Sequence, residues 1–173
     1  MPATALSPSH PSLPDQALAN TRPPVVTIRA ARQGDLESLC AMITALAAHH
    51  GDAATPTVAA LSNDLFGARP WVTALVAEAG GRLIGYAMLT PLYRANETAR
   101  GMDLHHLYVD PDHRGTGIGR HLGARAREEA VRAGCAYLSV GAATGNVRAH
   151  RFYESEHFTP RPVTGMRYLA RLS

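Results

Sequence analysis

The sequence has no lysine, few cysteines and no cluster of like charges. Its 173 residues include 17 basic side chains, all of them arginine, and the net charge is +3. These arginines are spread along the chain without a run of about five or six, so the pattern predicts no nucleic-acid partner. Arginine favours planar, bidentate contacts, which a small ligand carrying phosphate or carboxylate groups would satisfy.

The two cysteines, Cys40 and Cys135, lie far apart and lack the spacing of metal ligands. The nine histidines show no His-Glu-x-x-His spacing either. We therefore expect neither a disulfide framework nor a metal site, and we expect a reducing, cytoplasmic location. No apolar run reaches the roughly 18 residues that cross a bilayer, so we expect no membrane partner.

Proline is concentrated at the start of the chain, where residues 1–24 contain six prolines among serine, alanine and threonine. Such a segment buries too little apolar surface to offset its ordering entropy. The sequence therefore predicts a flexible tail over 1–24 and one domain over 25–173, a length that suits a single core.

Hydrophobic periodicity predicts a mixed α/β domain with an antiparallel start and at least one βαβ crossover. A Gly80-Gly81 turn joins two of the strands. Strands are predicted at 25–29, 71–79, 82–92, 102–109 and 137–140, followed by two short strands after residue 155. Helices are predicted from Asp35 to about His50, at 55–66 with Thr55-Pro56 as cap and first turn, at 118–133 and at 147–155.

A glycine-rich turn leaves the strand at 102–109 and opens the next helix. Gly115, Gly117 and Gly119 let the backbone approach a ligand closely, and free amides at the helix start suit a pyrophosphate. Arg114 and Arg120 flank the turn and can add charge-assisted contacts. The turn matches neither the dinucleotide-binding fingerprint nor the P-loop motif. The alternative to a phosphate site is a glycine-rich helix start that serves only packing.

Two motifs resemble the GNAT superfamily of N-acetyltransferases over residues 25–170. Arg114-Gly115-Thr116-Gly117-Ile118-Gly119 is similar to the family's Arg/Gln-x-x-Gly-x-Gly/Ala turn. About thirty residues later, Asn146, Ala149, Phe152 and Tyr153 resemble its Asn-x-x-Ala-x-x-Phe-Tyr helix. Within the superfamily, residues 46–50, 64–67 and 71–78 resemble the diamine (spermidine/spermine-type) acetyltransferases.

The resemblance implies a GNAT fold: a mixed, mostly antiparallel, twisted sheet, flanked by helices and splayed between the strands of Val109 and Tyr137. Acetyl-CoA is the implied co-substrate, with its pyrophosphate on the amides of 115–120 and its pantetheine along 107–109. The resemblance also implies a homodimer. The expected cofactor-binding residues are Leu107, Tyr108, Val109, Arg114, Gly115, Thr116, Gly117, Ile118, Gly119, Arg120, Asn146 and Tyr153.

Acetyl transfer to an amine needs a base and a proton for the leaving thiolate. By resemblance Tyr153 is the acid, and a core tyrosine beside Phe152 is the alternative. Strand alternation places Asp103 and His105 on one face and His106 on the other, so Asp103 and His105 are candidates for the base, directly or through water. The diamine enzymes more often have glutamate at the place of His105, which argues against a polyamine substrate.

His49, His50 and Asp52 end the first predicted helix, where the resembling family often forms its acceptor wall. With His106 they are the candidate substrate-binding residues; a solvated helix end, favourable for histidine, is the alternative. The predicted function is transfer of an acetyl group from acetyl-CoA to a primary amine of a small molecule. Acetylation of a protein lysine or N-terminus, and a non-catalytic acyl-CoA-binding module, are the alternatives.

Overall fold

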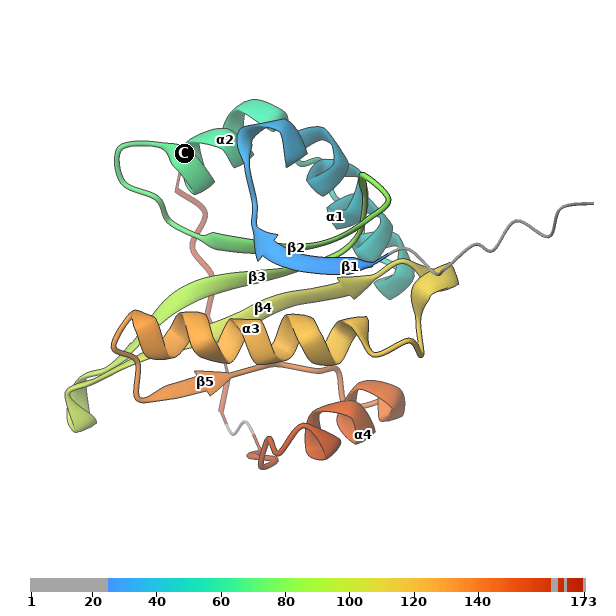
Figure 1. Ribbon diagram of the computed structural model, residues 1–173. Helices are drawn as coiled ribbons and strands as arrows, with labels where there is room; N and C mark the ends of the chain where they lie inside the picture. Colours follow the sequence, from blue (N-terminus) through green and yellow to red (C-terminus); the bar gives the residue numbers. More distant parts are fainter. Residues whose placement is uncertain (1–24, 163–164, 167, 173) are drawn as a thin grey trace, which may run out of the picture.

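The computed structural model describes residues 25–162, 165–166 and 168–172 (Figure 1). The tail predicted over 1–24 lies outside the described residues. No helix of the described part is long and apolar enough to cross a membrane.

The core element of the fold is one sheet of five strands in the order β1-β2-β3-β4-β5. The first three strand pairs are antiparallel, and β4 with β5 is parallel, which confirms the predicted mixed, mostly antiparallel α/β class (Figure 1). The strands are β1 (Val26–Ala30), β2 (Thr73–Ala79), β3 (Arg82–Arg94), β4 (Ala99–Val109) and β5 (Tyr137–Ser139). The helices are α1 (Leu36–His50), α2 (Val58–Phe66), α3 (Ile118–Arg132) and α4 (Val147–Ser155), with short 3-10 turns η1 (Gln33–Asp35), η2 (Ala95–Glu97) and η3 (Pro111–His113).

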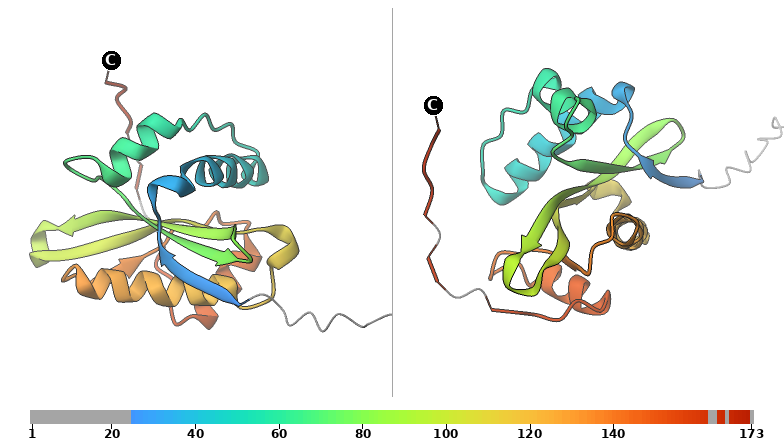
Figure 2. Two further views of the ribbon diagram at one scale, coloured as in Figure 1. Left: turned by 45° about the horizontal axis from the view of Figure 1, so that its top comes forward. Right: turned by 90° about the vertical axis from the view of Figure 1, so that its left-hand side faces the viewer.

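Helices cover both faces of this sheet. The views in Figures 1 and 2 place α1 and α2 over one face and α3 over the other. On the α1 side, Leu39 and Tyr86 are fully buried, and on the α3 side Leu104 and Leu122 are equally buried. Each such side chain contributes about 1.5–3 kcal/mol of transfer free energy, so both faces anchor β4, which lies between them.

The ends of α1 and α2 follow local capping chemistry. Gly51 ends α1 with a left-handed φ of 78°, which glycine adopts without strain. The cap of α2 is Thr57, whose hydroxyl accepts a hydrogen bond from the Ala60 amide at 3.2 Å. The expectation that Thr55-Pro56 forms the cap and first turn is therefore wrong by two residues. The helix begins after Thr57, because the Thr57 hydroxyl is the one that accepts the Ala60 amide, three residues later.

β4 and β5 separate soon after they meet. They pair only at Gly101, Met102 and Asp103, opposite Tyr137, Leu138 and Ser139, whereas β4 continues to Val109. The Tyr137 ring lies against Gly101, where a Cβ would come within 2.2 Å of it, and Arg94 stacks on the same ring at 4.1 Å. This packing fixes one end of the pair, and the strands diverge beyond Ser139, as the predicted splay requires.

Two strand predictions are corrected. Within residues 156–162, 165–166 and 168–172 there is no strand, because this segment runs clear of the sheet and meets no pairing edge (Figure 2). β2 begins at Thr73 instead of residue 71, because the Trp71 amide donates to the Asp64 carbonyl at 2.8 Å and not to a neighbouring strand.

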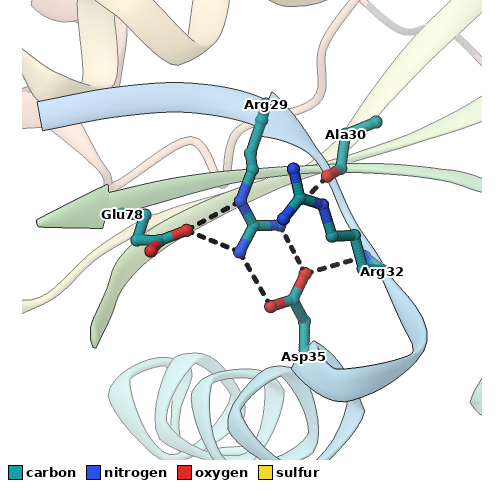
Figure 3. Close-up of polar contacts among 5 residues, drawn as sticks. All are labelled: Arg29, Ala30, Arg32, Asp35 and Glu78. Atoms are coloured by element: carbon teal, nitrogen blue, oxygen red, sulfur yellow. Dashed lines mark hydrogen bonds and ion pairs between the residues drawn. The ribbon is translucent and has the colours of Figure 1, made fainter. Parts of the chain in front are cut away.

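A half-buried arginine, Arg29, joins β1, β2 and the start of α1 (Figure 3). Arg29 donates to both oxygens of Asp35, at 2.6 and 3.0 Å, and to Glu78 at 2.7 Å. Asp35 also accepts the Arg32 amide at 2.7 Å. The hydrogen bonds from Arg29 lower the pKa of the Asp35 carboxyl. Because Asp35 lies at the turn into α1, this network sets the direction of the helix that later carries His49 and His50.

We expect Asp35→Asn to lower the free energy of unfolding by about 2–3 kcal/mol at neutral pH, because Arg29 loses a buried charged partner. The folded-state pKa of Asp35 is lowered, so its contribution is present above about pH 4 and is lost as pH falls through the folded value. Urea unfolding at several pH values measures this difference.

The matched control is Glu97→Gln, which breaks the exposed pair between Arg94 and Glu97 and should change stability by less than about 1 kcal/mol. Equal effects of the two substitutions would contradict the assignment of Asp35 as an anchor.

Candidate active site

A cleft of about 720 Å³ opens where β4 and β5 diverge. Its floor is β4 from Leu104 to Val109, one wall is the end of α1, and the other is the segment from Gly141 into α4. Twelve of its lining residues concern the chemistry: His49, His50, Asp52, His105, His106, Leu107, Tyr108, Val109, Arg114, Gly119, Asn146 and Tyr153. The structure therefore brings together, in one cavity, predicted residues from three separate parts of the chain.

The glycine turn reaches this cleft through Arg114 and Gly119, whereas Gly115, Thr116, Gly117 and Ile118 are not among its lining residues. Gly115 and Gly117 have φ values of 81° and 87°, which other residues rarely adopt, and α3 begins directly afterwards at Ile118. The Ile118 side chain is buried in the core, so only its amide can face a ligand. Amides of a first helical turn have no partner within the helix, and they can therefore hold an anionic group.

The two flanking arginines differ in their surroundings. Arg114 lines the cleft and donates through Nε to the Val109 carbonyl at 2.9 Å, which leaves its other nitrogens free to bind an anion. Arg120 instead pairs with Glu156 at 2.8 Å and does not line the cleft. Thr116 bonds the His113 carbonyl at 2.7 Å. A role for Arg120 in cofactor binding stays a prediction.

A β-bulge in β4 places the two histidines on the same face. The register pairs Leu104 with Leu89 and His106 with Met88, so His105 is the additional residue of the bulge. The His105 and His106 rings stack with centroids 4.7 Å apart and an angle of 14° between planes. The prediction that they lie on opposite faces is wrong, because the bulge interrupts the alternation on which it rested.

His106 is held by a buried tyrosine on β3. Its Nδ1 lies 2.9 Å from the hydroxyl of Tyr86, whose phenol pKa is raised by burial. Tyr86 is fully buried and therefore keeps its proton, for which Nδ1 is the acceptor within the described part of the chain. The neutral His106 ring then carries its proton on Nε2. Burial, followed by the charges of His105 and His50, lowers the pKa of His106.

Asp103 lies between β5 and His105. Its Oδ1 accepts the Ser139 hydroxyl at 2.8 Å, and its Oδ2 lies 3.8 Å from Nδ1 of His105. The shared face predicted for Asp103 and His105 is therefore present. The His105 side chain is 56% exposed, so its ring can exchange protons with water, whereas Asp103 lies behind it and does not line the cleft.

Tyr153 reaches the cleft from α4. Its ring packs edge-on against Phe152 and Phe158, with centroids 5.3 and 5.6 Å away. Burial and then the negative charge of Asp103 raise the pKa of the Tyr153 phenol, which therefore keeps its proton at neutral pH. Tyr153 packs against the core and also lines the cleft, so its role as the acid stays a prediction.

The remaining candidates are Asn146, which caps α4, and three residues at the end of α1, on the opposite wall of the cleft. Asn146 caps α4 by accepting the Ala149 amide at 3.0 Å, and its amide nitrogen faces no other described partner. His49 and His50 end α1 with their rings edge-on at 5.5 Å, and Asp52 follows beside the cleft. Among the described residues no group of three or more His, Cys, Asp or Glu side chains is arranged to hold a metal ion.

Three residues of the site were not predicted from the sequence: Tyr86, Ser139 and Arg148. Tyr86 looks like an ordinary core residue of a strand, and only the β3–β4 register brings it to His106. Ser139 becomes visible only when the parallel pair sets it opposite Asp103. Arg148 lines the cleft from the first turn of α4, and no motif in the sequence marks it.

The structure thus brings a glycine-rich helix start and a cluster of titratable side chains to one cleft beside the splayed strands. The chain belongs to the GNAT family, because the family model described as "Acetyltransferase (GNAT) family" matches residues 38–158, well over half of its length. It is an N-acetyltransferase, as its named relatives are.

Two curated relatives and one solved structure illustrate the similarity. The chain is 31% identical over 140 residues to thialysine N-epsilon-acetyltransferase of Sus scrofa, covering 75% of this chain and 82% of that protein. It is 32% identical over 133 residues to phosphinothricin N-acetyltransferase of Alcaligenes faecalis, covering 70% and 64%. An aminoglycoside acetyltransferase from an uncultured soil metagenomic sample shares the fold, with a TM-score of 0.72, 19% identity and coverage of 84% and 97%.

We expect His106 to titrate below the ordinary imidazole range, and His50→Asn to raise its pKa, because the substitution removes a nearby positive charge at low pH. NMR titration of the histidine signals measures both values. The control is His157→Asn, outside the cleft, which should leave His106 unchanged; an equal shift in both variants would contradict the placement of His50 beside His106.

Proposed function

We propose that the protein transfers the acetyl group of acetyl-CoA to a primary amine of a small molecule by direct attack. The observation that carries this proposal is the cleft itself. Its floor strand leads from His105 and His106 towards the glycine turn, of which Arg114 and Gly119 line the cleft, so proton-transfer groups and a candidate anion site lie at one cavity. A cofactor with a diphosphate at one end and a thioester at the other suits this arrangement.

The residues fit acetyl-CoA. Positive φ at Gly115 and Gly117 gives a cradle that a Cβ would strain, and the first amides of α3 are free to bind phosphate. Beyond Asp103, the edge of β4 that faces β5 pairs with no strand of the described residues, so its amides and carbonyls can bind the pantetheine arm. Asn146 can donate to the same arm while it caps α4. When bound, acetyl-CoA supplies the thioester carbonyl that the amine attacks.

His105 is our candidate for the base. Nδ1 faces the Asp103 carboxylate at 3.8 Å, which favours a proton on Nδ1 and leaves the Nε2 lone pair to accept a proton from the amine, directly or through water. His106 is less suited to this role, because the Tyr86 contact assigns its proton to Nε2. As a donor from the same face, His106 can instead orient the acceptor.

Tyr153 is our candidate for the acid. Its phenol keeps its proton at neutral pH, and two aromatic neighbours hold its ring in the cleft wall. A proton held at the Tyr153 hydroxyl can pass to the departing thiolate.

The acceptor enters, in this proposal, beside His49, His50 and Asp52. Asp52 can attract the ammonium of an incoming amine, and the imidazoles can bind a polar chain without a strong charge. The names of two relatives, which refer to thialysine and phosphinothricin, support an amino-acid-like amine as the first class to test. The free thiols Cys40 and Cys135 support a cytoplasmic location.

We also propose a homodimer. Four large apolar side chains of the segment after α4, namely Met166, Tyr168, Leu169 and Leu172, are 81–94% exposed. Water-exposed apolar groups on one segment are typical of a surface that another chain covers. A second copy of this chain is the simplest partner, since closed twofold dimers are the commonest oligomers.

We expect thiol release from acetyl-CoA with at least one amine from a panel of thialysine, phosphinothricin, methionine sulfoximine, polyamines, arylalkylamines, aminoglycosides and a basic peptide. Tyr153→Phe should lower kcat by about 100-fold or more with little change in KM for acetyl-CoA, because only the proton donor is lost. The chain has no lysine side chain that could itself accept the acetyl group.

Tyr93→Phe is the matched control, because Tyr93 is exposed on β3 outside the cleft. Wild-type turnover by Tyr153→Phe would remove the tyrosine from the mechanism. Calorimetric binding of acetyl-CoA without turnover on any amine would favour the non-catalytic module, and activity on the peptide alone would favour protein acetylation.

The full chain should sediment as a dimer, and the double substitution Tyr168→Ser with Leu169→Ser should shift it towards monomer. The control Val131→Ser removes one exposed apolar residue of α3 and should leave the dimer intact. A monomeric full chain in sedimentation equilibrium would contradict the dimer.

A further inference from the structure

Ser139 occupies the last position at which β4 and β5 pair. It is the final residue of β5, opposite Asp103, and the two strands separate immediately after it. Its hydroxyl lies 2.8 Å from Oδ1 of Asp103 and 3.5 Å from the Met102 carbonyl. A hydroxyl donates one proton, and the shorter contact with a charged acceptor takes it. Ser139 therefore donates its hydroxyl proton to the Asp103 carboxylate.

The hydrogen bond from Ser139 gives the two oxygens of the Asp103 carboxylate different neighbours. With Oδ1 bound to Ser139, the carboxyl plane is fixed and Oδ2 is the oxygen that lies near His105 Nδ1, at 3.8 Å. An ionised carboxylate only accepts hydrogen bonds, so Nδ1 is favoured as the protonated nitrogen of His105. The other nitrogen, Nε2, is then left with a lone pair.

We propose that Ser139 is a positioning residue, whose hydroxyl orients Asp103 so that His105 holds its proton on Nδ1 and presents Nε2 as the acceptor in the cleft. This inference rests on the proposed function, in which His105 is the base. Ser139 itself does not line the cleft, so it acts through Asp103 and His105 and not on the substrate.

Among the described residues, the other groups around His105 do not orient its ring by hydrogen bonds, so the contacts from Ser139 through Asp103 are its polar support. His106 stacks on the ring, and Tyr86 of β3 engages His106 and not His105. From α1, His50 lines the same cleft, and from α4, Tyr153 contributes a neutral phenol. Asp52 also lines the cleft from the end of α1, but among the described residues Asp103 is the carboxylate within 4.0 Å of a His105 ring nitrogen, at 3.8 Å. The orientation of the Asp103 carboxylate therefore favours one His105 nitrogen as the protonated one.

The experiment compares wild type, Ser139→Ala and Ser139→Thr, with Ser62→Ala as a control on the exposed side of α2. Long-range ¹⁵N–¹H NMR spectra of the ligand-free protein at about pH 8.5, above the ordinary imidazole pKa, report which ring nitrogen is protonated. His105→Gln assigns the His105 signals. We expect Nδ1–H to dominate in wild type, Ser139→Thr and Ser62→Ala, and to give way to Nε2–H in Ser139→Ala.

Turnover provides the second measurement. Ser139→Ala should lower kcat about tenfold while KM for acetyl-CoA stays within about twofold, and Ser139→Thr should restore most of kcat, because the effect needs only a hydroxyl. If Ser139→Ala does not fold, Ser139→Cys, a much weaker donor, replaces it in both measurements.

An unchanged His105 tautomer in Ser139→Ala would overturn the proposal, whatever the turnover. A tautomer shift in a protein that acetylates no amine would support the role of Ser139 and refute the proposed function instead. A tautomer shift with unchanged kcat on an active acceptor would overturn the catalytic part of the inference.

Discussion

The separation of β4 from β5 after Asp103 and Ser139 is the constraint on which the site depends. Three paired positions, with the Tyr137 ring against Gly101, hold the strands together at one end. Within the part of the chain that the structure describes, the remaining length of β4 has one edge without a strand, and the cleft lies along this length. A fully paired sheet would give the same core and leave no room for a ligand. Ser139 therefore ends the pair and orients a carboxylate at the same point.

The bulge at His105 has a similar double effect. One additional residue in β4 turns two adjacent imidazoles to one face, where their rings stack. Their partners differ, since a carboxylate faces His105 and a buried phenol faces His106. The Tyr86 hydrogen bond assigns the His106 proton to Nε2, whereas the nearby Asp103 carboxylate favours a proton on Nδ1 of His105. Under the proposed function, two chemically identical side chains thus acquire different roles, one as proton acceptor and one as hydrogen-bond donor, through Asp103 of β4 and Tyr86 of β3.

The order and type of the elements were accessible from the sequence because periodicity, caps and glycine turns act locally. The start of α3 at Ile118 follows from Gly115 and Gly117, and most strand limits agree within a few residues. The faces of His105 and His106 were not accessible, because a bulge is defined by the register with a distant strand. Ser139 and Tyr86 were missed for the same reason. The strands expected after residue 155 did not form in the described residues, since strand propensity without a pairing edge does not make a sheet.

The free edge of β4 also links the energetics of the fold to its ligand. Backbone amides and carbonyls without a strand partner must be solvated or bound, and under the proposed function the pantetheine arm takes the place of a missing strand. A ligand that binds only the folded state adds stability in proportion to the logarithm of its concentration, about 2.7 kcal/mol at one hundred times Kd. Under the proposed function, the stability of the fold would then rise with the concentration of any ligand that carries a pantetheine arm, with or without its acetyl group, because the arm fills the gap in the sheet.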